Sequence, residues 1–158
     1  MNPSSPYFRA EAAPVAAIRN AILGILAFGV AGILAELLLL EHTEGRWQIF
    51  PVALLAAAAI VITWNIVDRQ SAAGIRVLQG VMLAFVVCGA VGIVLHYNGN
   101  VEFELERNSD QSGLALFWEA IKGATPSLAP GAMVQLGLMG LAYSFRHPAV
   151  HTDQRETE

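Results

Sequence analysis

Long, unbroken apolar stretches constrain this chain more than any other feature of its sequence. Four of them approach the roughly 20 residues with which an α-helix crosses about 30 Å of hydrocarbon. Their polarity does not alternate, as it would along the strands of a membrane barrel. Charged residues make up 14% of the 158 residues, against roughly a quarter in soluble domains. Since a helix pairs its own backbone groups inside hydrocarbon, the sequence predicts an all-α integral membrane protein, a bundle of four transmembrane helices.

The predicted organisation is a single membrane domain over residues 1–158. Arg9 and Arg19 precede the first span as they would precede a signal peptide, but the apolar core is too long for one, so we interpret it as a retained anchor. The expected parts are a polar N-terminal tail, four spans, a long loop before the fourth span and a polar C-terminal tail. They cover residues 1–14; about 20–40, 50–67, 77–97 and 128–145; 98–127; and 146–158.

The basic residues of the connections predict the orientation. Cytoplasmic connections carry an excess of Lys and Arg, which places both termini in the cytoplasm and the loop over residues 98–127 on the extracytoplasmic side. The preference for Arg with abundant Ala and Gly is typical of a bacterial inner membrane. The cytoplasmic set is Arg9, Arg19, Arg69, Arg76, Arg146 and Arg155, and the outer set is Arg46, Arg107 and Lys122.

The long loop carries two patterns. In the first, Val101, Phe103 and Leu105 alternate with glutamates, a period of two that predicts a half-buried strand. In the second, Ser112 can cap a short helix. This helix is expected to be amphipathic and to lie in the outer membrane interface; its apolar face comprises Leu114, Phe117, Trp118 and Ile121.

Small residues predict how the spans pack. A ridge with a period of four runs along the third span, and a second small face lies on the first span. Such faces let helix backbones approach closely in lipid, so we expect the two to meet inside the bundle; the alternatives are lipid exposure of an Ala/Gly-rich chain, or a homodimer seam. The residues are Gly80, Ala84, Cys88 and Gly92, ending at His96, and Gly29, Gly32 and Glu36.

Few polar side chains lie within the spans. Asn65 and Gln135 are expected to form interhelical hydrogen bonds. Cys88 is the single cysteine, so it fills space and forms no disulfide framework. His147 and His151 are expected to be solvated in the C-terminal tail.

One polar cluster is a candidate site. Glu36 lies about one turn inside the outer boundary, and Glu41, His42 and His96 are expected at a similar outer depth. Intramembrane charges are costly and often functional. Two imidazoles could bind a haem or, with a carboxylate, a metal ion, or they could form a proton-responsive cluster.

Two classes of function follow. The first is a non-catalytic accessory or structural subunit that packs against a protein partner or against itself in the bilayer, without a cofactor. The second is a small transporter, redox protein or metal- or haem-binding protein that uses Glu36, His42 and His96. No phosphate-binding loop, zinc-protease motif or nucleophile elbow is present in the sequence, and a net charge of −4 without a basic run argues against nucleic acid.

Overall fold

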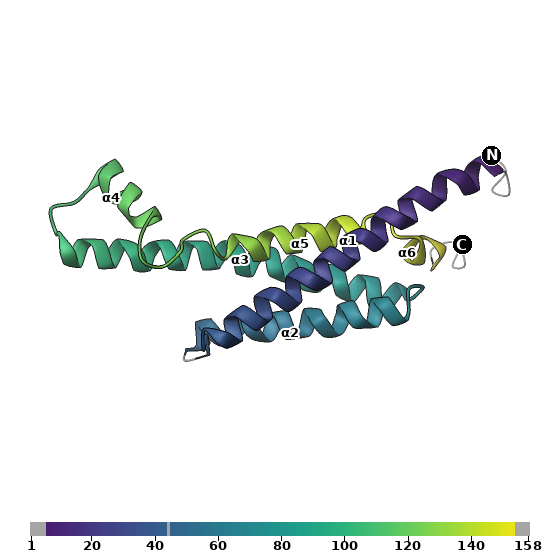
Figure 1. Cartoon of the computed structure of the whole chain (residues 1–158), viewed down its shortest axis with the longest axis horizontal. Coiled ribbons are helices and arrows are strands. Elements are labelled where there is room, and N and C mark those ends of the chain that lie inside the picture. The colour runs from purple at the N-terminus through teal and green to yellow at the C-terminus, as the bar shows by residue number, and fades with distance from the viewer. Residues whose placement is uncertain (1–5, 44, 154–158) are drawn as a thin grey trace. The chain divides into compact units, whose positions relative to one another are not determined.

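The computed structural model describes residues 6–43 and 45–153, and the regular structure within them is entirely helical (Figure 1). Among these residues, three helices are long and apolar enough to cross a membrane, which fits a multi-pass integral membrane protein. The elements are α1 (Pro6–Leu39), α2 (Arg46–Val67), α3 (Ala72–Arg107), α4 (Gly113–Ile121), α5 (Gly131–Ser144) and α6 (Pro148–Asp153).

The three candidate membrane helices are α1, α2 and α3. Their stretches are Pro14–Leu39, Arg46–Val67 and Ala72–Arg107, with mean hydropathies of 2.4, 2.2 and 2.4. Each helix begins before the span predicted for it, and α3 also continues past the predicted end. The fourth predicted span coincides with α5, which has only 14 residues and a length of roughly 21 Å. The structure therefore supports three spanning helices and leaves the fourth span a prediction.

The chain divides into two compact units, Met1–Met82 with Met139–Glu158 (unit 1) and Leu83–Leu138 (unit 2). In unit 1, α1 and α2 run antiparallel and pack against each other (Figure 1). The core of unit 1 consists of large apolar side chains, with Leu26, Leu55, Ile75 and Leu78 completely buried. Interdigitating aliphatic side chains thus hold this unit together.

The turn between α2 and α3 belongs to unit 1 and is held by polar contacts. The Ser71 hydroxyl accepts the Gly74 N–H at 3.1 Å, which satisfies one of the unpaired donors at the start of α3. Asn65 on α2 donates to the Gly74 carbonyl on α3 at 3.1 Å. The predicted interhelical hydrogen bond of Asn65 is therefore confirmed. Gln135 is exposed, and no hydrogen bond engages its side chain within the described part of the chain.

In unit 2, α3 continues through the segment for which the sequence predicted a strand. Residues 98–107 are helical, and Glu104 is buried while Phe103 is 46% exposed, the reverse of the expected alternation. The strand prediction is wrong because extending an existing helix adds a backbone hydrogen bond with each residue, whereas a lone strand leaves its edges unpaired. An ion pair between Glu104 and Arg107 at 3.1 Å, one turn apart, supports this last part of the helix.

The start of α5 approaches α3 very closely within unit 2. A Cβ atom at Gly89 would lie 2.7 Å from the Pro130 carbonyl oxygen and 2.8 Å from the Val134 nitrogen, and one at Gly92 would lie 2.7 Å from the Pro130 Cβ. Both glycines therefore allow a backbone contact that any side chain would obstruct.

Candidate functional site

The predicted polar residues of unit 1 lie at the end of α1 and in the turn that follows it. Glu36 is exposed, and no hydrogen bond or ion pair engages its carboxylate among the described residues. Glu41 adopts a left-handed conformation with φ of 50°, in which its backbone turns the chain toward α2. His42 is half-buried in the same turn.

His96 belongs to unit 2. Its Nδ1 lies 3.1 Å from the Pro126 carbonyl oxygen, so the ring donates a hydrogen bond there when Nδ1 carries the proton. The imidazole thus connects α3 to the segment before α5. Because His42 and His96 belong to different units, their sharing of one site stays a prediction.

Metal ligation requires several donors in close proximity. Among the side chains that the structure describes, no group of three or more His, Cys, Asp or Glu residues gathers closely enough to hold a metal ion. The haem or metal alternative for His42 and His96 also stays a prediction.

Only some residues of the predicted small-residue faces make close contacts. An added Cβ at Gly32 or Gly80 would meet no atom within 4 Å, so these two glycines do not bring α1 and α3 together within the chain. Gly29, Ala84 and Cys88 are half-buried. The close approach occurs instead at Gly92 and at Gly89, a residue outside the predicted ridge.

One row of α1 is left open along the apolar helix. Gly24, Phe28, Gly32 and Glu36 recur every four residues and are all exposed, Phe28 to 82%. An added Cβ at Gly24 or Gly32 would meet no neighbour within 4 Å. We call these four residues the open row of α1. It combines a smooth backbone with one aromatic side chain and one carboxylate, features that helix association in lipid uses.

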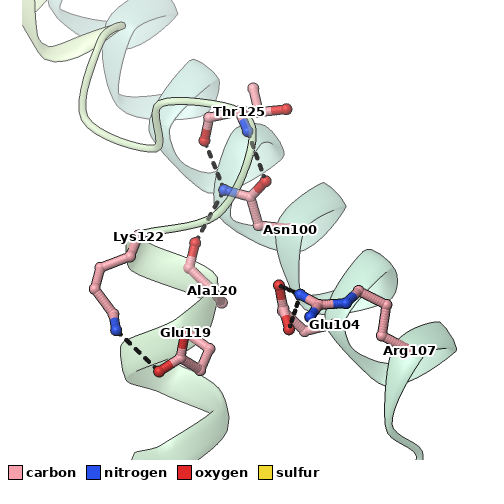
Figure 2. A network of polar contacts seen from close by, with 7 residues as sticks. All are labelled: Asn100, Glu104, Arg107, Glu119, Ala120, Lys122 and Thr125. Carbon is pink, nitrogen blue, oxygen red and sulfur yellow. Dashed lines mark hydrogen bonds and ion pairs between the residues drawn. The ribbon is translucent and has the colours of Figure 1, made fainter.

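Asn100 holds unit 2 together where α3 leaves the predicted span. Its amide donates to the carbonyl oxygens of Ala120 at 2.9 Å and Thr125 at 2.6 Å, and to the Ser127 hydroxyl at 2.9 Å. Its carbonyl oxygen accepts the Thr125 N–H at 3.1 Å. Figure 2 shows the side chain between the end of α4 and the following turn, with flanking pairs Glu104–Arg107 and Glu119–Lys122.

The Asn100 residue is 2% exposed, so its hydrogen bonds to Ala120 and Ser127 are shielded from water, while those to Thr125 are partly shielded. Gly123 leaves the necessary space, because a Cβ there would overlap the Asn100 amide. A ring contact between Tyr97 and Phe117, with centroids 5.9 Å apart, supports the same junction. The network joins α3 to the end of α4 and the following turn, and its role is structural.

In unit 1, Arg19 joins α1 to the end of α5 by hydrogen bonds. Its guanidinium donates to the carbonyl oxygens of Tyr143 at 2.6 Å, Phe145 at 2.9 Å and Arg146 at 3.1 Å. These carbonyls lie at the C-terminal end of α5, where unpaired oxygens and the helix dipole favour a cation. Arg69 adds a hydrogen bond to the side-chain amide oxygen of Asn20 at 2.9 Å, so both guanidinium groups lie at one end of unit 1.

His147 lies beside this arrangement and is buried, not solvated as the sequence suggested. Its Nδ1 accepts the Ala149 N–H at 3.3 Å, and its ring lies 5.4 Å from that of Tyr143. Burial and the positive charge of Arg19 lower the pKa of His147 below its ordinary value of 6.5. The neutral ring therefore caps the start of α6.

Sequence reasoning missed Asn100, Arg19 and Gly89 as structural residues. A lone Asn beyond an apolar span and an Arg at a span boundary are compatible with simple solvation. The signal that could have identified Asn100 is the pair of helix-ending elements, Gly123 and Thr125-Pro126, which leave unpaired carbonyls in the loop.

No protein-family model matches the chain, and no similar protein was found among the curated proteins or among the solved structures.

Proposed function

We propose that this chain is a four-pass, non-catalytic membrane protein that acts as an accessory or structural subunit and associates through the open row of α1. The observation that carries the proposal is Glu36, an exposed carboxylate without a partner among the described residues, on a helix apolar enough to span a membrane. Three features support the proposal: the number of passes, the cost of the exposed carboxylate in lipid and the shape of the surface around it.

Support for a fourth pass comes from the segment that precedes α5. Backbone hydrogen bonds of the i to i+3 type run from Pro126 to Met133, including Gly131 N–H to the Leu128 oxygen at 2.9 Å. Tight turns of this type rise about 2.0 Å per residue. Together with the 14 residues of α5, the segment extends over roughly 30 Å, close to the hydrocarbon thickness. With an even number of passes, both termini lie on the arginine-rich, cytoplasmic side.

The exposed carboxylate of Glu36 is costly in lipid. In lipid, an acidic side chain on a spanning helix costs on the order of 2.5–3.5 kcal/mol at the centre and less toward the boundary. Glu36 lies one turn before Leu40, so part of this cost applies. A neighbouring helix that donates a hydrogen bond to the carboxylate would remove the cost, which makes association favourable at this position.

The surface around Glu36 has the shape that helix packing requires. Gly24 and Gly32 offer a backbone that no described residue covers, and Phe28 between them is 82% exposed. Small residues favour helix association through van der Waals contact. A helix of a second copy, or of a partner protein, can therefore lie along the open row and reach Glu36.

The test is native mass spectrometry of the protein released from its own membrane, with an absorption spectrum of the same sample. We expect a homo-oligomer or a complex with a partner chain, and no haem absorption band. Gly32→Leu fills the open row and should abolish the complex, and Glu36→Ala should weaken it. Ala56→Leu is the control, because Ala56 is an exposed position on α2 outside the row.

Two results would contradict the proposal. A monomer without any partner, extracted gently and identical for all variants, would exclude association through α1. A bound haem or metal that is lost when His42 or His96 is replaced would instead favour the redox or metal-binding alternative.

A further inference from the structure

The end of unit 1 that holds Arg19, Arg69 and Arg146 combines positive charge with exposed apolar side chains. We propose that this basic end binds the phosphate group of an anionic glycerophospholipid. The inference depends on the membrane location of the helices and not on the association through α1.

Hydrogen bonds of two of the arginines bring all three residues to the same end of unit 1. Arg19 donates hydrogen bonds to the carbonyl oxygens of Phe145 and of Arg146 itself, and Arg69 donates to Asn20, the residue after Arg19. Contacts across three segments of the chain, α1, the end of α2 and the end of α5, therefore gather the charges that are far apart in the sequence.

Their charge is not balanced by a carboxylate. No ion pair joins Arg19, Arg69 or Arg146 to an acidic side chain among the described residues. Asp68 is adjacent to Arg69 in sequence, and its carboxylate accepts the Gln70 N–H at 3.2 Å; its one negative charge stands against the three positive charges of the arginines. The carbonyl oxygens that surround Arg19 carry partial charges only. A phosphate at this end would therefore meet a net positive field.

Two of the guanidinium groups have donors to spare. An arginine has five N–H donors, and Arg69 uses one on Asn20. Arg146 is exposed, and its guanidinium lies 5.5 Å from the centre of the Phe145 ring, with no hydrogen-bond acceptor among the residues that the structure describes. Planar guanidinium groups are well suited to bidentate hydrogen bonds with phosphate oxygens. Arg69 and Arg146 are thus the direct ligands, and Arg19 positions the end of α5 between them.

The apolar side chains next to the arginines favour a lipid over free phosphate. Ile18 precedes Arg19, Val67 lies two residues before Arg69, and Phe145 precedes Arg146; they are 59%, 81% and 67% exposed. Apolar side chains would not stabilise a free phosphate ion. A glycerophospholipid would bring its acyl chains to them while its phosphate meets the guanidinium groups, as basic sites between membrane helices do.

The experiment places the full-length protein in nanodiscs of phosphatidylcholine with a minor fraction of phosphatidylglycerol. The protein is then released gently, and the bound lipids are counted by native mass spectrometry. We expect phosphatidylglycerol to be retained in preference to phosphatidylcholine, and Arg69→Gln combined with Arg146→Gln to reduce this retention about thirtyfold. Arg46→Gln is the matched control, because Arg46 is an exposed arginine at the opposite end of α2.

A second variant keeps the test decisive if the double variant does not fold. Arg146→Gln alone removes a side chain that makes no hydrogen bond to the described part of the protein, so the fold should be unaffected and retention should fall about fivefold. Equal retention of both lipids by the wild type, or retention unchanged in Arg146→Gln, would overturn the proposal. Displacement of phosphatidylglycerol by excess inorganic phosphate would also overturn it, since the site would then recognise free phosphate.

Discussion

Unit 1 and unit 2 hold their helices together by different means. In unit 1, aliphatic side chains such as Leu26, Leu55 and Ile75 fill the space between helices. In unit 2, the backbone of Pro130 lies directly against Gly89 and Gly92, and Asn100 completes the junction with hydrogen bonds. The difference matters in a membrane, because lipid chains can replace a lost aliphatic contact but cannot replace a backbone contact or a buried amide.

The largest expected effect comes from removing the Asn100 amide. Asn100→Ala leaves the Thr125 carbonyl oxygen and N–H without this partner, while the Ala120 carbonyl oxygen keeps the Ser127 hydroxyl at 3.1 Å. Each buried polar group left unpaired costs about 1–3 kcal/mol. We expect the free energy of unfolding to fall by about 3 kcal/mol. Reversible unfolding in mixed detergent micelles measures it.

The control for this prediction lies on the same helix. Asn98 is exposed, and Asn98→Ala should change the free energy of unfolding by less than about 0.5 kcal/mol. Equal effects of the two variants would mean that the hydrogen bonds of Asn100 do not stabilise unit 2.

The second prediction concerns two glycines of α3: Gly80, which belongs to the predicted packing ridge, and Gly89, which does not. Gly89→Ala forces a methyl group against the Pro130 and Val134 backbone and should destabilise the protein by about 2 kcal/mol. Gly80→Ala meets no neighbour within 4 Å and should stabilise the helix by about 0.5 kcal/mol. Changes of opposite sign in the free energy of unfolding would support the close backbone contact at Gly89. Changes of the same sign would contradict it.

A smaller effect is expected in unit 1 from Arg19→Gln. The variant loses charge-assisted hydrogen bonds to the end of α5, but the aliphatic core remains, so we expect a loss of about 1.5 kcal/mol. Arg46→Gln, at an exposed position, should have almost no effect. If Arg19→Gln cost more than Asn100→Ala, polar contacts would dominate unit 1 as well.

The smallest effect is a pH dependence from His147. Its pKa is lowered in the folded protein by burial and by Arg19, so the unfolded chain binds the proton more readily. The contribution of His147 to stability is complete above pH 6.5, the ordinary value, and is lost as the pH falls below it toward the folded pKa. His147→Asn retains an acceptor for the Ala149 N–H but cannot titrate, so its stability should vary less with pH between 5 and 7.

The sequence predicted the helical class and the location of the apolar spans, because apolar length and backbone pairing in lipid leave few alternatives. It also predicted an interhelical hydrogen bond for Asn65, though not the partner helix, which the structure shows to be α3. It failed over residues 101–105, where a short alternating pattern competed with the continuation of an existing helix. It also placed His147 in solvent, since burial by a distant segment leaves no local signal.

What the sequence alone determined about this protein is therefore its environment. Hydropathy depends on local composition, and three stretches of the chain are long and apolar enough by themselves to cross a membrane. What only the tertiary structure decided is which of several equivalent residues make contacts. Gly89 packs while Gly80 does not, and Arg19 holds the end of α5 across more than a hundred residues, because these contacts depend on how distant helices approach one another.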